Sequence, residues 1–175
     1  PQAIPNTHGI PRSVMSEVLI APFNDLEATA AIIAKHHDEL AGVILEPVQR
    51  TFEPRPGFLQ GVREVTANYD IPLIFDEVVT GFRMGLGGAQ ATYGVTPDLC
   101  ALGKAISGGL PLGVLCGRED LMAIANPKRR LQMLPYSMQT GTFSSNPVCA
   151  SVACAIIEEL EKPGVYERLE EVGTR

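Results

Sequence analysis

Two ionisable residues stand out because each follows an apolar run that has the pattern of a buried strand. Lys104 lies in DLCALGKAISGGLPLGVLCG (98–117), and Asp76 ends IPLIFD (71–76), 28 residues earlier. An amine among apolar side chains loses its preference for the charged form, which favours attack on a carbonyl group and formation of a Schiff base. A nearby carboxylate can keep the ring nitrogen of a pyridine-type cofactor protonated.

Simpler interpretations of these residues stay open at this point. Asp76 and Lys104 could form a structural salt bridge at the edge of a sheet. The segment GTFSSNP (141–147) could hold a phosphate, because a Gly-Thr before a helix offers backbone amides and a hydroxyl. Ser145 or Asn146 could equally be the N-cap of that helix.

Apolar runs alternate with amphipathic segments along the chain, which predicts an α/β fold with a mostly parallel sheet flanked by helices. In such sheets ligands bind beyond the carboxyl ends of the strands, where this chain places Glu46, Asp76–Glu77 and Lys104. We expect the long helix over 146–162 to be buried against the sheet. Strands are predicted at 41–47, 71–78, 98–103 and 112–117, and helices at 24–40, 56–70, 87–94, 119–125, 146–162 and from 163 onward.

Composition narrows the class of protein. The chain has 175 residues, of which 45% are apolar and 19% charged, as in globular proteins. The net charge of −6 gives no footprint for nucleic acid, and the sequence has neither a membrane span nor a signal peptide. The chain starts with Pro1 in a polar, turn-rich segment, so we interpret it as part of a larger protein.

Cysteines and histidines point to no metal site. The four cysteines form no CxxC pair, which favours reduced thiols in the core of a cytoplasmic protein. No histidine has metal-ligand spacing with a cysteine or a carboxylate cluster, and those at 36 and 37 end a helical stretch. The residues concerned are Cys100, Cys116, Cys149, Cys154, His8, His36 and His37.

Neither phosphate-loop motif is complete. The Gly103–Lys104 pair lacks the Walker A glycine, since position 98 is Asp, and it lacks the following Ser or Thr, since position 105 is Ala. GLGGAQ (85–90) has Gln90 where a dinucleotide fingerprint ends in glycine. A nucleotide-binding α/β domain is therefore disfavoured.

Several long motifs occur in a familiar order: LEPVQ, PGFLQGVRE, LIFDEVVTGFR, GGAQATYGVTPDL, LGKAISGGLPLGVLCGR and GTFSSNPV. Together they resemble class III, pyridoxal-phosphate-dependent aminotransferases, and most closely the glutamate-1-semialdehyde 2,1-aminomutase-like members. The resemblance implies a fold-type-I transferase. Residues 1–175 would form the central segment of its large cofactor domain, without the N-terminal phosphate-cup segment or the C-terminal small domain.

The resemblance also implies individual roles. Lys104 matches the lysine that forms the Schiff base with pyridoxal 5'-phosphate and shuttles the substrate proton. Asp76 matches the carboxylate beside the pyridine nitrogen, and Val78 the apolar residue packed on the ring. Thr142 matches a threonine that binds the cofactor phosphate of the partner subunit, which implies a homodimer with a shared active site. Glu77 accompanies Asp76 and receives no chemical role.

The substrate is left open by departures from the family pattern. Many class III aminotransferases carry an acid five residues after the glutamate of the EP motif, and here that position is Thr51. The aminomutase usually has GNMN-like and GTLSGNP stretches where this chain has RTFE and GTFSSNP. We therefore expect amino transfer between small-molecule donors and acceptors, with intramolecular amino transfer or a catalytically incomplete fragment as alternatives.

Overall fold

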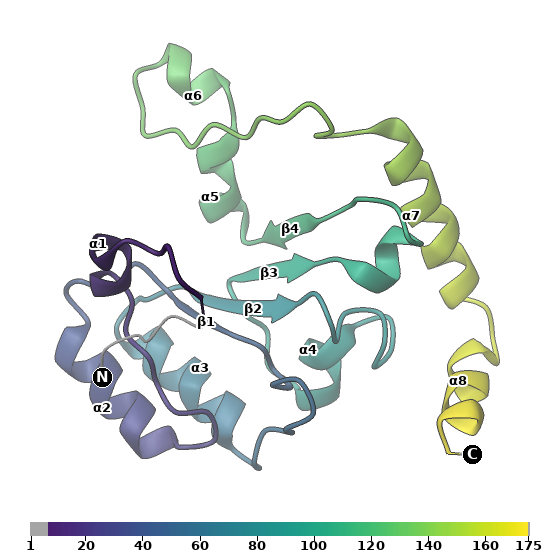
Figure 1. Cartoon of the computed structure of the whole chain (residues 1–175), viewed down its shortest axis with the longest axis horizontal. Coiled ribbons are helices and arrows are strands. Elements are labelled where there is room, and N and C mark those ends of the chain that lie inside the picture. Colours follow the sequence, from purple (N-terminus) through teal and green to yellow (C-terminus); the bar gives the residue numbers. More distant parts are fainter. Residues whose placement is uncertain (1–6, 175) are drawn as a thin grey trace.

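The computed structural model describes residues 7–174 as a four-stranded sheet flanked by helices (Figure 1). The α/β architecture expected from the alternating pattern is confirmed, with short 3-10 helices η1 and η2 in addition. The elements are α1 (Arg12–Ser16), α2 (Leu26–His36), β1 (Val43–Leu45), α3 (Phe58–Asn68), β2 (Leu73–Glu77), α4 (Gly88–Tyr93), β3 (Leu99–Leu102), η1 (Lys104–Ser107), β4 (Val114–Gly117), α5 (Glu119–Met122), η2 (Ala123–Ala125), α6 (Lys128–Leu131), α7 (Pro147–Leu160) and α8 (Val165–Gly173).

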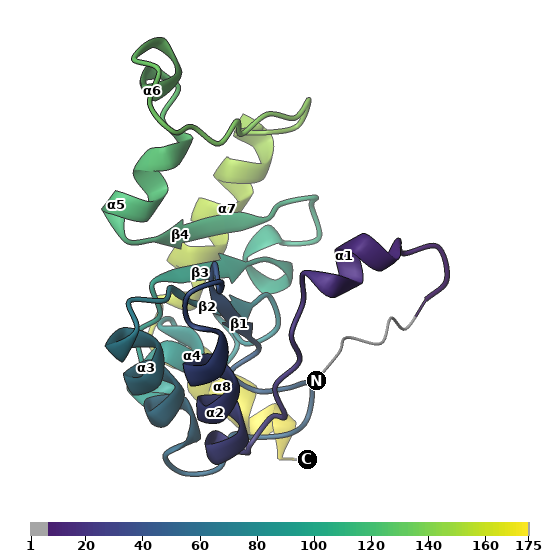
Figure 2. The same cartoon turned by 90° about the vertical axis from the view of Figure 1, so that its left-hand side faces the viewer.

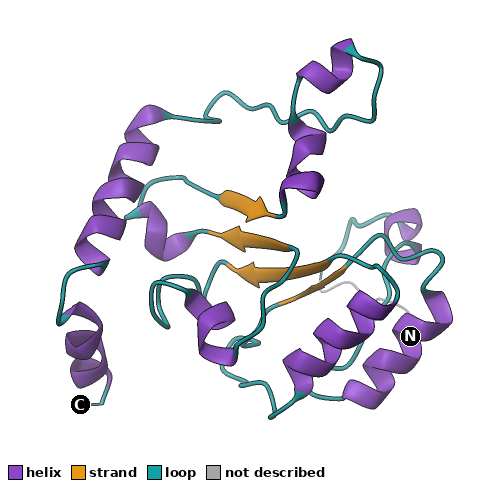
Figure 3. Cartoon of the chain, turned by 180° about the vertical axis from the view of Figure 1, so that it is seen from behind, coloured by secondary structure: helices purple, strands orange, loops and turns teal. Residues whose placement is uncertain are grey.

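The strands lie in the order β1-β2-β3-β4. The first three are parallel, with Ile44 opposite Ile74 and Asp76 opposite Ala101. The fourth is antiparallel to β3 and points the opposite way in Figure 3. The carboxyl ends of β2 and β3 therefore meet at one edge of the sheet, which is the end that α7 borders in Figure 1.

One face of the sheet carries the core. Leu73 and Phe75 of β2 are fully buried against Phe58, Leu59 and Val62 of α3. Side chains alternate along a strand, so Ile74 and Asp76 face the other way. That second face is barely covered, and Ile44 and Leu115 are exposed on strands beside it. Figure 2 shows α2 and α3 together on one side of the sheet.

The helix α7 does not lie against the sheet, contrary to the prediction. It packs on η1, and among its own residues Cys149 and Ala153 are buried. Its first turn is capped by the Asn146 side chain, which accepts hydrogen bonds from the amides of Val148 and Cys149 at 2.9 and 3.4 Å. The capping interpretation of GTFSSNP is therefore confirmed for Asn146.

The four cysteines are free, but they are not all in the core. Cys100 and Cys149 are buried, whereas Cys116 and Cys154 are exposed. Cys116 lies on β4, the last strand of the sheet, and Cys154 on a helix that is covered along one side. Burial raises the pKa of the Cys100 thiol to about 12, with a further contribution from Glu77.

Two further absences hold for the described residues. None of the helices within 7–174 has the length and apolar content needed to cross a bilayer. Over the same residues, no three histidine, cysteine or carboxylate side chains gather as a metal site. His36 instead pairs with Glu39 at 2.7 Å, and the ring of His37 stacks on that of Tyr69.

Candidate active site

The residues predicted to do chemistry lie at the carboxyl ends of β2 and β3. Asp76 is the fourth residue of β2, opposite Ala101 of β3, and Lys104 comes three residues after Ala101. Apolar side chains bury both strands within the sheet. The polar residues at their carboxyl ends therefore lie side by side at the same edge. The prediction that neighbouring strands present these two residues is confirmed.

Asp76 is half-buried and keeps part of its carboxylate available. Its Oδ1 accepts a hydrogen bond from the Val78 amide at 3.1 Å, and within residues 7–174 no donor is found for Oδ2. A carboxylate fixed by one oxygen can accept a proton or hydrogen bond with the other. This free oxygen is the acceptor that a protonated ring nitrogen requires.

Lys104 adopts a backbone conformation that is rare for residues other than glycine. Its φ is +46°, in the left-handed region, and its carbonyl accepts a hydrogen bond from the Ser107 hydroxyl at 2.6 Å. Such conformations cost free energy and persist only where the surroundings enforce them, often at functional sites. The constraint comes from η1, which begins at this residue.

The side chain of Lys104 is exposed, so the prediction of an apolar environment for its amine is wrong for this chain by itself. The apolar neighbours in the sequence point elsewhere, as the burial of Ile106 shows. The structural salt bridge is also wrong, because no ion pair joins Lys104 to Asp76 in the described part of the chain. The amine is thus left free for a ligand.

Glycines allow the two strand ends to approach each other and α7. A methyl group on Gly103 would lie 3.4 Å from a Val78 methyl carbon, so Val78 packs directly beside the residue that precedes Lys104. Gly108 has a φ of +57°, and a Cβ there would lie 2.7 Å from Ile156 of α7. The helix α7 therefore packs against the carboxyl end of η1 and supports the turn that carries Lys104.

Thr142 lies apart from this group in the chain. It is exposed in a turn between α6 and α7, where the Ser144 amide donates to the Gly141 carbonyl at 3.0 Å. In the described residues no hydrogen bond or ion pair joins it to Asp76, Val78 or Lys104. The structure thus brings three of the four predicted residues together within one chain.

Glu77 was given no chemical role, yet it is the most buried ionisable residue of this edge, at 1% exposed. Its Oε2 accepts from the Thr80 hydroxyl at 2.9 Å and from the Ala89 amide at 2.6 Å. The sequence held one signal for this contact. The pair Gly87–Gly88 opens α4 where an approaching side chain needs room.

The loop after Glu77 is also held from a distance. The Tyr166 hydroxyl of α8 donates to the Phe82 carbonyl at 2.9 Å, and Phe82 has a φ of +61°. Burial raises the pKa of Tyr166, which keeps its hydroxyl protonated as a donor. The loop over 78–87 is therefore tied at its start by Glu77 and in its middle by Tyr166.

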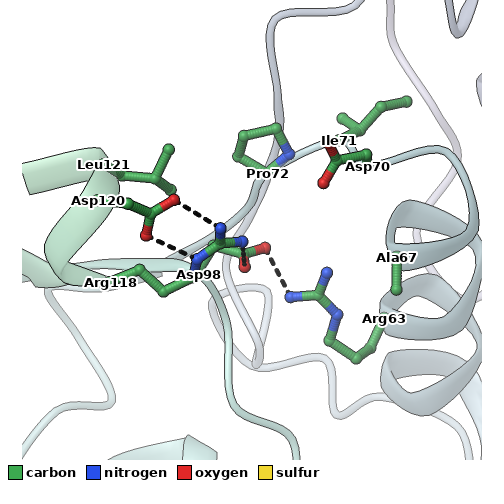
Figure 4. Close-up of a pocket in the computed structure, with 9 residues that line it drawn as sticks. All are labelled: Arg63, Ala67, Asp70, Ile71, Pro72, Asp98, Arg118, Asp120 and Leu121. Atoms are coloured by element: carbon green, nitrogen blue, oxygen red, sulfur yellow. Dashed lines mark hydrogen bonds and ion pairs between the residues drawn. The ribbon is translucent and has the colours of Figure 1, made fainter.

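A separate pocket of about 270 Å³ lies at the opposite end of the sheet (Figure 4). Asp98, just before β3, accepts hydrogen bonds there from Arg63 at 2.7 Å, Arg118 at 2.8 Å and the Leu73 amide at 2.8 Å. Burial alone would raise the pKa of Asp98, but these donors hold it at about 2. The arginines are already paired with carboxylates, so this pocket offers a ligand little free charge.

Comparisons with known proteins show the family to which this chain belongs. The family model for Aminotransferase class-III matches residues 4–175. Among solved structures, the chain is similar to an ω-transaminase from Sphaerobacter thermophilus, with 40% identity and a TM-score of 0.89 over 98% of this chain and 39% of that chain. It is also similar to a protein described as a transaminase with PLP bound, with 30% identity and a TM-score of 0.86 over 96% of this chain and 39% of that chain.

A third similar structure is a β-phenylalanine aminotransferase from Variovorax paradoxus. Its identity is 34% and its TM-score 0.71, over 85% of this chain and 33% of that chain. The chain therefore spans about two fifths or less of each of these solved proteins. Since the family model matches nearly every residue, the chain belongs to the class III aminotransferases.

Proposed function

We propose that this chain is the central segment of the cofactor domain of a pyridoxal-phosphate-dependent aminotransferase. The observation that carries the proposal is the shared edge of β2 and β3. It presents an exposed amine at Lys104, a carboxylate at Asp76 with one oxygen free, and the apolar Val78, which follows β2 and lies beside Gly103. An amine, an acceptor for a ring nitrogen and an apolar contact are the groups that a pyridine aldehyde requires.

Each of the three residues at this edge would have a different role toward the cofactor. Lys104 would attach the cofactor through its Nζ amine and then carry the proton that leaves the substrate carbon. Asp76 would keep the ring nitrogen protonated through its free oxygen, and Val78 would pack on the ring. When bound, pyridoxal phosphate supplies an electron sink that stabilises the negative charge left on the substrate carbon.

The partner in this proposal is a second copy of the chain. Large apolar side chains between α6 and α7 are exposed, with Met133 at 92% and Phe143 at 71%. Apolar groups so exposed commonly mark an interface. Thr142 lies next to Phe143, which supports its assignment to the cofactor phosphate of the partner subunit in a homodimer. We place this dimer in the cytoplasm, in keeping with four free thiols.

The substrate class is an amino acid with a keto acid, or an amino compound that bears an aldehyde. The test uses the full-length protein in its pyridoxamine form, offered keto acids and, separately, glutamate-1-semialdehyde. Aminotransferase function predicts half-reactions with keto acids that Lys104→Ala abolishes. Turnover of the semialdehyde without any added acceptor would show an aminomutase instead. Failure of both reactions, with no visible absorbance from a bound cofactor, would leave a catalytically incomplete protein.

A further inference from the structure

The carboxylate of Glu77 is the centre of the turn that joins β2 to α4. It accepts hydrogen bonds from the Thr80 hydroxyl at 2.9 Å and from the amides of Ala89 and Gln90 at 2.6 and 3.3 Å. Across residues 7–174 it has no cationic partner. A buried carboxylate without such donors would be costly, so the turn and the start of α4 are fixed around it.

Glycines keep the space that this carboxylate needs. A Cβ on Gly88 would lie 2.4 Å from Oε2 of Glu77, and Gly88 has a φ of +58°. The backbone of Glu77 is used as well, because the Gly81 amide donates to its carbonyl at 2.9 Å, and a Cβ on Gly81 would lie 2.8 Å from that oxygen. Side chain and backbone together thus define one conformation for residues 77–81.

The same turn carries the groups that face the ligand. The Val78 amide donates to Asp76 at 3.1 Å, and the Val78 side chain lies against Gly103, the residue before Lys104. Glu77 points to the opposite face of β2 from Asp76 and contacts neither the amine nor the free oxygen of Asp76. Any shift of the turn would nevertheless move Val78 and, through it, both reactive groups.

We infer that Glu77 is a positioning residue for amino transfer: it fixes the turn over 77–81 and thereby orients Asp76 and Val78 toward the cofactor beside Lys104. The inference rests on the proposed function. It predicts that a change at Glu77 alters how the cofactor is held, beyond any loss of stability.

The test measures pyridoxal phosphate binding to the cofactor-free, full-length protein. Glu77→Gln keeps the shape of the side chain but turns one acceptor into a donor that faces other donors. We expect its dissociation constant for pyridoxal phosphate to rise about tenfold, the effect of losing one hydrogen bond to a charged group. The pH at which the visible absorbance of the bound cofactor changes should move as well, because Asp76 is displaced.

Two matched variants separate positioning from stability. Thr80→Val removes a single donor to Glu77 without changing shape, and should give a smaller change in the same direction. Asp98→Asn disturbs a buried carboxylate at the opposite end of the sheet, and should lower the melting temperature while leaving the dissociation constant within about twofold. If Glu77→Gln does not fold, Thr80→Val decides the question.

Wild-type binding and an unchanged pH profile in both Glu77→Gln and Thr80→Val would overturn the inference. An equal loss of binding in Asp98→Asn would also overturn it, because the effect would then follow from stability alone. Failure of the wild-type protein itself to bind pyridoxal phosphate would instead contradict the proposed function. The two failures are therefore distinguishable.

Discussion

Each end of the sheet contains a buried carboxylate, and the two carboxylates are stabilised in different ways. At the amino end, Asp98 is held by the guanidinium groups of Arg63 and Arg118. Arg118 also pairs with Asp120, so two positive and two negative charges cancel within the chain. At the carboxyl end, Glu77 is held by a hydroxyl and two backbone amides. The first end is closed by ion pairs, whereas the second leaves Lys104 and one oxygen of Asp76 without a partner in the described chain.

This difference separates stability from chemistry. A charge that is already paired gains little from a ligand, and the pocket of Figure 4 lies at the paired end. Under the proposed function, the charges left free at the other end bind the cofactor and the substrate. Under the proposed function, this pocket is thus a poorer guide to the reactive residues than the state of the ionisable groups.

The largest expected effect on stability comes from removing the carboxylate of Asp98. Asp98→Ala should lower the free energy of unfolding of the cofactor-free protein by about 3 kcal/mol, because it leaves Arg63 and the buried Leu73 amide without a carboxylate and leaves Arg118 with Asp120 alone. Urea unfolding measures this change. Asp120→Asn is the control, since Asp120 also binds Arg118 but lies exposed, and it should have a far smaller effect. Similar losses in both variants would contradict the comparison.

A smaller loss of stability is expected when the pH is lowered. Because the pKa of Asp98 is about 2 in the folded chain and the ordinary value is 3.8, Asp98 contributes stability above about pH 4 that is lost as the pH falls toward 2. The difference in unfolding free energy between wild type and Asp98→Asn should therefore shrink below about pH 4. A difference that stays constant down to about pH 3 would show that the folded pKa is not lowered.

The smallest effect has the opposite sign and belongs to the carboxyl end. Lys104→Gly should raise the free energy of unfolding by about 0.5 kcal/mol, because glycine adopts a φ of +46° without strain. The same change should abolish amino transfer. Lys128→Gly serves as a control in the helix α6, where glycine should destabilise. Destabilisation by both variants would argue against strain at Lys104.

Much of the fold could be predicted, because short apolar runs and turn residues indicate where individual strands and helices begin and end. The strand that contains Asp76 and the strand that ends shortly before Lys104 were correctly located from short apolar runs. The direction of β4 could not be found in this way, since an apolar run looks the same in parallel and antiparallel pairs. The prediction that α7 packs on the sheet failed for a related reason, because its small residues suit η1 equally well.

The positions of Asp76 and Lys104 could be predicted, because both residues lie where predicted strands end. The exposure of Lys104 was not, because apolar neighbours in the sequence do not surround a side chain when the backbone turns to a φ of +46°. The contact of Arg63 with Asp98 and that of Tyr166 with Phe82 join residues 35 and 84 positions apart, beyond the reach of local patterns. Glu77 was overlooked because its partners are mainly backbone amides.

We propose above all that the carboxyl end of the sheet is the reactive end and that Lys104 supplies its amine. The full-length protein, loaded with pyridoxal phosphate and reduced with borohydride, should carry the cofactor on one lysine that peptide mass spectrometry can identify. We expect the label on Lys104, and none on Lys35, Lys128 or Lys162. Label on another of these lysines, or undiminished label after Lys104→Ala, would contradict it.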